Sequence, residues 1–367
     1  MRREWPLLLS VATSAAFLTF GPRWLADLSN PVWFAFLFVW LFLVMLLSSF
    51  YVVRHAERLA VKLGEPGGTL VLTLAVIGIE TLMISAVMLT GQGNASLARD
   101  AMFAVIMIVL NGMVGCSLLL GGLRYHEQTY NLQGANAFLS VIVPLAVLSL
   151  VLPSFTASSP GPTFSPHQAA FLIVMSIGLY GVFLAMQVSR HSSYFAEPSL
   201  VESTEESRRA LSLDGEDRPV AQQILLLVAH LIPVVILSKQ IAVPINHGIH
   251  ELHAPPALGG LLVSMLVLFP ESLSAGRAAL ANQLQRCVNL LLGSVLASIS
   301  LTIPAMLTVG FMMNQTIILG LDAVDMTLLL LTLVLSLLTF ASARTNVLLG
   351  AVHLLVFLAY VMLIFEK

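Results

Sequence analysis

The chain has 367 residues, of which 58% are hydrophobic and only 10% are charged, and its mean hydropathy is +0.93. A soluble protein of this length carries about 25% charged residues, so this composition excludes an ordinary soluble domain and indicates a protein that lies in lipid. The formal net charge of −2 excludes the basic surface that nucleic-acid binding requires. The two cysteines, Cys116 and Cys287, lack metal-site spacing, and we expect them to be small buried residues.

Apolar segments follow one another along almost the whole chain. A helix that crosses a bilayer needs about 20 predominantly apolar residues. Eleven segments approach this length: residues 5–20, 31–53, 68–90, 100–122, 136–153, 168–188, 220–238, 257–280, 287–310, 325–341 and 345–365. Arg2 and Arg3 before the first of them are typical of a signal peptide, but residues 21–24 are a poor cleavage site, so we expect an uncleaved helix.

The positions of the basic residues predict the orientation of these helices. Cytoplasmic loops of membrane proteins carry an excess of Lys and Arg. With the N-terminus in the cytoplasm and eleven spans, 13 of the 17 basic residues fall in the inside segments. A missed or added helix upstream would move many of these basic residues to the outside segments and abolish the excess. The sequence therefore predicts an all-α polytopic membrane protein of about eleven helices, with the N-terminus inside and the C-terminus outside.

Residues 190–219 interrupt the apolar pattern with seven acidic residues among serines and arginines. This composition is typical of a solvated linker, which we place in the cytoplasm; a regulatory or ion-sensing role for it stays open. It leaves an extra N-terminal helix (1–30), a first five-helix repeat (31–189) and a second (220–367). Because five is odd, the second repeat enters the membrane from the opposite side, which predicts inverted-topology repeats in a 1 + 5 + 5 arrangement.

Two glutamates lie near the middle of apolar runs at equivalent places in the two repeats. Glu80 follows Gly78 in the second span of the first repeat, and Glu271 follows Pro270 in the second span of the other. A carboxylate at this depth is costly and mainly marks an ion or proton pathway. We expect Gly78, Pro270 and Pro304 to break their helices and free backbone carbonyls, which with carboxylates are ligands for Ca²⁺, Na⁺ or K⁺. The sequence therefore predicts a cation site at the two glutamates.

Hydroxyl and amide side chains on the same helices could add ligands to this site. The candidates are Thr73, Thr81, Ser85, Asn111, Ser272, Ser274, Asn282 and Ser298. The alternative for each is a role in helix packing. His247, His250 and His253 form a run in a segment expected to be an outside loop, where they could bind a transition metal, sense pH or simply be solvated. We expect His353, in the last span, to be a packed, hydrogen-bonded residue rather than a proton relay.

Several classes of function lack their motifs in this sequence. Neither a phosphate-binding loop nor a dinucleotide fingerprint is found, so we expect no nucleotide partner and infer that another ion gradient supplies the energy. An intramembrane enzyme would require paired aspartates or a His-Glu-x-x-His helix, and an organic-solute permease would not need two symmetric carboxylates. Both remain distant alternatives, and a strictly monovalent Na⁺ or K⁺/H⁺ antiporter is the nearer one.

Three stretches resemble the cation/proton exchanger branch of the cation/calcium exchanger superfamily, and within it the bacterial ChaA-type antiporters. Residues 63–70 (LGEPGGTL) with residues 78–80 (GIE) are similar to the start of the first α-repeat of that family. Residues 270–273 (PESL), 282–284 (NQL) and 292–294 (LGS), on to Pro304, resemble the second α-repeat of the family. Residues 344–350 (RTNVLLG) resemble the Arg-Ser-Asn-Trp-Leu-x-Gly signature, so the resemblance covers essentially the whole chain.

The resemblance implies an inner-membrane antiporter that exports cytoplasmic Ca²⁺, and in the ChaA branch also Na⁺ and K⁺, in exchange for protons and without a cofactor. It implies that the paired glutamates of the family are Glu80 and Glu271. Plant and fungal members usually carry Gly-Asn-x-x-Glu in both repeats, whereas no asparagine immediately precedes either glutamate here. The remaining ligands, the choice between Ca²⁺ and monovalent ions, and homo-oligomer formation therefore stay open.

Overall fold

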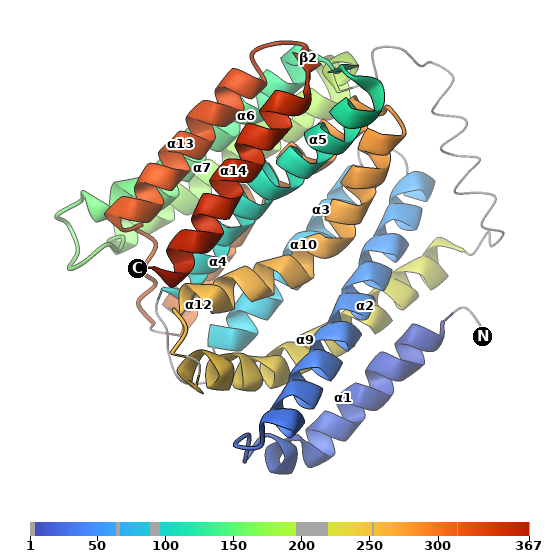
Figure 1. The fold of residues 1–367 in the computed structure, drawn as a ribbon, viewed down its shortest axis with the longest axis vertical. Helices are drawn as coiled ribbons and strands as arrows, with labels where there is room; N and C mark the ends of the chain where they lie inside the picture. The colour runs from blue at the N-terminus through green and yellow to red at the C-terminus, as the bar shows by residue number, and fades with distance from the viewer. Residues whose placement is uncertain are drawn as a thin grey trace. The chain divides into compact units, whose positions relative to one another are not determined.

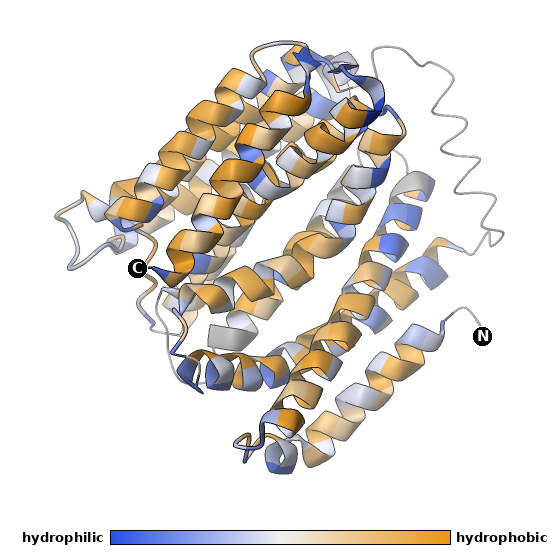
Figure 2. Cartoon of the chain, in the orientation of Figure 1, coloured by the Kyte–Doolittle hydropathy of each residue, from blue (hydrophilic) through white to orange (hydrophobic). Residues whose placement is uncertain are grey.

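The structure is a computed structural model of the chain that describes residues 4–63, 67–88, 96–195, 219–251, 253–313 and 315–366. Almost all of these residues are helical, and the one sheet among them pairs β1 (Gln128–Thr129) with β2 (Arg344–Thr345) in antiparallel fashion. Figure 2 shows apolar residues along the length of the helices. The fold is an all-α polytopic membrane protein, as the composition predicts. Most of the acidic linker, residues 196–218, lies outside the described residues.

Nine helical segments in the described ranges are long and apolar enough to cross a membrane. They are Trp5–Trp24, Pro31–Leu59, Leu97–Tyr125, Leu132–Ser154, Pro166–Ser189, Val220–Glu251, Ala257–Leu280, Leu284–Met312 and Val347–Phe365. Two shorter apolar helices, Thr73–Ser85 and Ala323–Thr339, lie within the two other predicted spans. Every predicted segment thus corresponds to an apolar helix, while the number of crossings and the orientation of the N-terminus remain predictions.

One compact unit contains the extra helix and four further helical segments (Figure 1). They are α1 (Trp5–Trp24), α2 (Pro31–Leu63), α3 (Gly67–Met88), α9 (Val220–Glu251) and α10 (Ala257–Leu280) as far as Pro270. Helices α2 and α9 pack against each other, and both contact α1 and α3. The turn between α1 and α2 is closed by Trp33, whose indole N–H donates to the Trp24 carbonyl at 3.1 Å.

The histidine run differs from the prediction because α9 is longer than the predicted span. This helix continues through Pro244 to Glu251, so His247 and His250 are helical rather than in a loop. The ring of His247 lies 5.3 Å from that of Phe34 on α2. Only His253 lies beyond the helix, where it is exposed. The three side chains therefore do not form a loop site of the predicted kind.

The second compact unit contains α10 from Glu271 onward and the remaining helices. These are α4 (Leu97–Met107), α5 (Val114–Tyr125), α6 (Leu132–Ala146), α7 (Pro166–Ala185), α11 (Leu284–Ala297), α12 (Ile303–Met312), α13 (Ala323–Thr339) and α14 (Val347–Phe365). A π-helical turn, η1 (Ile108–Met113), joins α4 to α5, and another, η6 (Ser298–Thr302), joins α11 to α12. Because α11 contacts η1 and α4 contacts η6, the two long helices cross near their π turns.

The compact units do not coincide with the predicted repeats. The first unit takes the extra helix, the first two spans of the first repeat, and the second repeat as far as Pro270 in its second span. The second unit takes the last three spans of each repeat and the rest of α10. In the first repeat the division falls after α3, whereas in the second repeat it falls within α10, between Pro270 and Glu271. Such interleaving is compatible with inverted repeats, whose boundaries at 31–189 and 220–367 remain predictions.

The C-terminal signature at residues 344–350 has a local structural explanation. Its first two residues form β2, which pairs with β1. Asn346 then caps α14, because its side-chain oxygen accepts a hydrogen bond from the N–H of Leu349 at 3.2 Å. Gly350 lies directly against the backbone of α5. The signature therefore starts α14 and sets its close contact with α5.

Candidate cation-binding site

Glu80 lies on α3 in the first compact unit and is only 2% exposed. The side chains of Ile79, Met83 and Ile84 beside it are also buried. An ionised carboxylate in such apolar surroundings is unfavourable unless a counter-charge or hydrogen-bond donors compensate it. This environment is the one that the sequence predicts for a transported ion.

Glu271 lies on α10 in the second compact unit and is 6% exposed. One of its carboxylate oxygens, Oε2, accepts a hydrogen bond from the hydroxyl of Ser294 on α11 at 2.7 Å. Ser294 is not among the site residues that the sequence predicts. The sequence feature that could have identified Ser294 is its position in the Leu292-Gly293-Ser294 stretch, which resembles the second α-repeat.

We expect Ser294→Ala to reduce apparent cation affinity about tenfold or more while maximal exchange is largely retained. A hydrogen bond to a charged group contributes about 1.5–3 kcal/mol, and here it favours the ionised carboxylate that binds a cation. Ser294→Thr keeps the hydroxyl and is the matched control. Cation titrations in everted membrane vesicles would measure the change, and equal half-saturating concentrations for wild type and Ser294→Ala would contradict it.

The predicted helix breakers do not break their helices. Helix α3 is continuous through Gly78, and α10 is continuous through Pro270. Proline lacks an N–H, so Pro270 still leaves the carbonyl of Leu266 without its usual intrahelical donor. The irregular backbone of the described residues lies elsewhere, in π turns that include η1 and η6 in the third span of each repeat, with Pro304 just after η6. Single π turns are frequent at functional sites.

Asn111 is fully buried in η1, and its side chain is hydrogen-bonded inside the second unit. Its Nδ2 donates to Thr332 Oγ1 at 2.7 Å, and its Oδ1 lies 3.2 Å from Nδ1 of His353. The other ring nitrogen of His353 lies 2.9 Å from Thr339 Oγ1. His353 is thus a packed, hydrogen-bonded residue, as expected. Asn111 is directed toward α13 and α14, and a role for it as a ligand remains a prediction.

The other candidates on helices divide between the two units. Half-buried Thr73, Thr81 and Ser85 share α3 with Glu80, and half-buried Ser272 and Ser274 share α10 with Glu271. Ser298 is buried and begins η6. Each unit therefore holds one glutamate and hydroxyl groups on the same helix, while the pairing of the two glutamates remains a prediction.

Asn282 does not lie on a helix, contrary to the sequence interpretation. Helix α10 ends at Leu280, and Asn282 is exposed in the turn before α11, with a left-handed φ of 57°. Asparagine tolerates this conformation better than most residues. Its side-chain oxygen accepts a hydrogen bond from Gln128 Nε2 at 2.9 Å. Its position is that of a turn residue that links α10 to β1.

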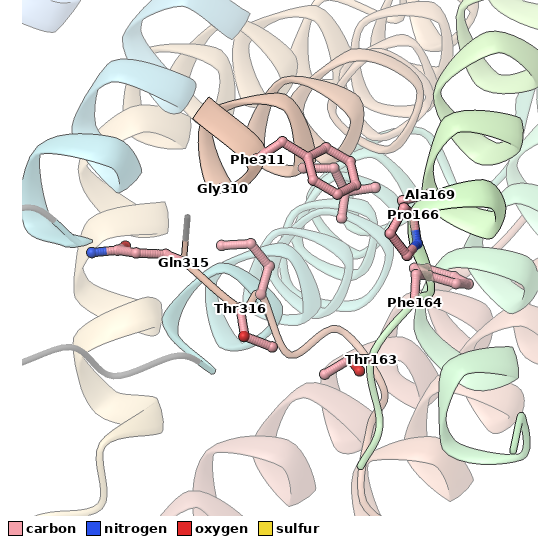
Figure 3. A pocket seen from close by; sticks show the side chains of 10 residues that line it. Thr163, Phe164, Pro166, Ala169, Gly310, Phe311, Gln315 and Thr316 are labelled. Carbon is pink, nitrogen blue, oxygen red and sulfur yellow. The ribbon is translucent and has the colours of Figure 1, made fainter. Parts of the chain in front are cut away.

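A cavity of about 240 Å³ lies in the second unit, between the start of α7 and the residues that follow α12 (Figure 3). Its lining includes Thr163, Phe164, Phe311 and Gln315. Among the described residues, no acidic or histidine side chain lines it. This cavity therefore lacks the ligands expected of the predicted cation site.

Sequence and structure comparisons agree on the family. A family model described as sodium/calcium exchanger protein matches residues 33–189 and 223–366, which include both glutamates. The chain is 41% identical over 325 residues to the sodium-potassium/proton antiporter ChaA of Escherichia coli K12, covering 88% of this chain and 86% of that protein. It is 25% identical over 269 residues to a Ca²⁺/H⁺ antiporter of Aphanothece halophytica, covering 71% of each.

The solved structure of native YfkE has the same fold, with a TM-score of 0.74 and 17% identity over 98% of this chain and 100% of that one. The family match leaves out the first 32 residues and residues 190–222, where the sequence predicts the extra helix and the linker. The resemblance to cation/proton exchangers is thereby confirmed. The chain belongs to the sodium/calcium exchanger family, a family of membrane antiporters.

Proposed function

We propose that this protein is a secondary antiporter of a bacterial inner membrane that exports cytoplasmic Ca²⁺, and also Na⁺ and K⁺, in exchange for protons. The observation that carries the proposal is the burial of one carboxylate within each of two apolar helices, at Glu80 and Glu271. A buried carboxylate inside a membrane span needs a cation or a proton as its counter-charge. The printed functions of the relatives, sodium-potassium/proton and Ca²⁺/H⁺ antiport, support the same chemistry.

Competition between cations and protons for the two carboxylates would couple the two fluxes. Desolvation and mutual repulsion both disfavour two ionised carboxylates that share a site. One Ca²⁺, or alternatively two protons, neutralises the pair. If only neutralised states cross during alternating access, export of the cation requires import of protons. An exchange of two protons per Ca²⁺ is electroneutral, and each extra proton would draw about 2.3 kcal/mol per 100 mV from the membrane potential.

A strictly monovalent antiporter is the second candidate, because the relative with 41% identity is named for sodium and potassium. Ligand chemistry does not separate the two candidates, since carboxylate, hydroxyl and carbonyl oxygens suit Ca²⁺ as well as Na⁺ or K⁺. The same two glutamates would serve either ion. Selectivity must therefore be measured.

Everted vesicles with an imposed pH gradient, monitored by a pH-gradient dye, test the proposal. We expect CaCl₂, NaCl and KCl each to dissipate the gradient, and CaCl₂ to half-saturate at the lowest concentration because its double charge neutralises both carboxylates. Vesicles without the protein are the control. A response to NaCl and KCl alone would establish the monovalent alternative, and no response to any of the three salts would contradict cation/proton exchange.

A further inference from the structure

A separate cluster of metal-ligand side chains lies in the first compact unit. Glu4 precedes α1, His55 lies on α2 and His230 lies on α9, and one ligand atom from each lies within 4.8 Å of the others. The carboxylate Oε2 of Glu4 is 3.5 Å from Nε2 of each histidine. His55 is 1% exposed and His230 is 0% exposed. We refer to these three residues as the Glu4–His55–His230 cluster.

A fourth side chain fixes the protonation of one ligand. Nδ1 of His55 lies 2.9 Å from the amide oxygen of Gln223, which is 1% exposed. Because an amide oxygen can only accept, Nδ1 carries the proton and Nε2 of the neutral ring presents a lone pair toward Glu4. A metal-binding histidine is typically held in this way by a hydrogen bond from its other ring nitrogen.

Protonation of both histidines is a poor alternative explanation for the cluster. The rings of His55 and His230 stack with centroids 5.3 Å apart and planes inclined by 27°. Two buried imidazolium ions in this arrangement would repel each other, and one carboxylate could neutralise only one of them. If both rings are neutral, a lone pair that faces the carboxylate is unfavourable without a cation between them. Within the described residues, Nδ1 of His230 has no hydrogen-bond partner, and its Nε2 lies 3.5 Å from Oε2 of Glu4.

We propose that this cluster binds a transition metal ion of the Zn²⁺ or Co²⁺ class. Metal–nitrogen and metal–oxygen bonds of about 2.1 Å at tetrahedral angles separate ligand atoms by roughly 3.4 Å, close to the two measured separations of 3.5 Å. The ligand atoms of the two histidines lie within 4.8 Å of each other, so a shift of about 1.4 Å or less would bring them to the same separation. Imidazole nitrogen suits these metals and does not suit Ca²⁺, so the site is chemically different from that of the transported ions.

The Glu4 side chain is 17% exposed, but its Oε2 and the Nε2 atoms of both histidines are buried, so a water enclosed with them would take the fourth coordination position. The bound ion would join Glu4, directly before α1, to residues of α2 and α9, so the extra N-terminal helix would be fastened to the rest of its unit. A ligand that binds only the folded state raises thermal stability. We therefore expect Zn²⁺ to raise the apparent melting temperature of the protein in detergent.

Cobalt binding to the full-length, metal-stripped protein, purified without a histidine tag, tests the proposal. We expect one equivalent of Co²⁺ with the visible absorption of a tetrahedral site, displaced by Zn²⁺. Binding should be lost in His55→Ala and His230→Ala. Gln223→Ala removes only the partner of His55 and should weaken Co²⁺ binding about 10–100-fold.

Two controls separate this site from others. His253→Ala removes an exposed histidine outside the cluster, and the double variant Glu80→Gln, Glu271→Gln removes the proposed transport site. Both should keep the wild-type Co²⁺ spectrum and the stabilisation by Zn²⁺. Absence of the spectrum in the wild-type protein, or its persistence in His230→Ala, would overturn the proposal. If the histidine variants do not fold, unchanged affinity in Gln223→Ala would overturn it equally.

Discussion

Replacing either Glu80 or Glu271 by glutamine is expected to reduce cation/proton exchange by about 10²–10³-fold while the protein still folds. Glutamine has nearly the shape of glutamate but cannot carry the negative charge that attracts a cation or take up a transported proton. Removal of one partner from a buried ionic interaction costs about 3–5 kcal/mol, which corresponds to a loss of this size in affinity. Dissipation of a pH gradient in everted vesicles would measure it.

Glu127→Gln is the matched control for this experiment. The Glu127 side chain is 59% exposed and forms an ion pair with Arg344 at 3.4 Å, and exposed pairs of this kind contribute about 0–1 kcal/mol. The variant should therefore exchange cations as the wild type does. Gel filtration in detergent would show whether each variant is folded. Exchange at the wild-type rate in both buried-glutamate variants would reject the assignment of the site.

The positions of the membrane-spanning helices were predictable because the lipid environment restricts strongly which sequences can span it. A span must satisfy its own backbone hydrogen bonds and present apolar side chains, so its position is readable from hydropathy alone. For the same reason a single acidic residue within a span, such as Glu80 or Glu271, is conspicuous, and the structure shows both to be buried. The pairing of the two remains a prediction.

Local backbone geometry was less predictable. Gly78 and Pro270 suggest broken helices, yet both helices continue, because membrane helices tolerate these residues where neighbours satisfy the freed groups. The π turns η1 and η6 have no comparable sequence signal. Asn282 was grouped with the helical residues although the predicted apolar segment 257–280 ends where α10 ends, two residues earlier.

Contacts between distant residues were not predictable from one sequence. The hydrogen bond from Ser294 to Glu271 joins different helices. The Glu4–His55–His230 cluster combines a residue directly before α1 with residues of α2 and α9, and no spacing of the kind found in short metal motifs connects them. Each residue alone has an ordinary explanation: Glu4 could be a helix cap, and His55 and His230 could be isolated polar residues in long helices. Only the fold brings them together.

The contact between α5 and α14 leads to the second large expected effect: Gly350→Ala should destabilise the protein by about 1–3 kcal/mol, and Gly350→Leu by more. A Cβ at Gly350 would lie 2.6 Å from the backbone nitrogen of Leu119 and 2.9 Å from the carbonyl oxygen of Gly115. Both are backbone atoms, so no rotamer change can relieve the clash and the helices must separate. Gly115 on α5 is equally close to α14, because a Cβ added there would lie 3.0 Å from the carbonyl oxygen of Gly350.

Close contact of small residues is a principal source of stability between membrane helices, because lipid supplies no hydrophobic force that drives them together. Separation of α5 from α14 would therefore lose dispersion contacts along the whole crossing. Gly178→Ala on α7 is the matched control, since that position is exposed and has no atom within 4 Å of an added Cβ. The melting temperature of Gly178→Ala in detergent, followed by gel filtration, should equal or exceed that of the wild type. A Gly350→Ala variant as stable as Gly178→Ala would show that the two helices do not cross at this distance.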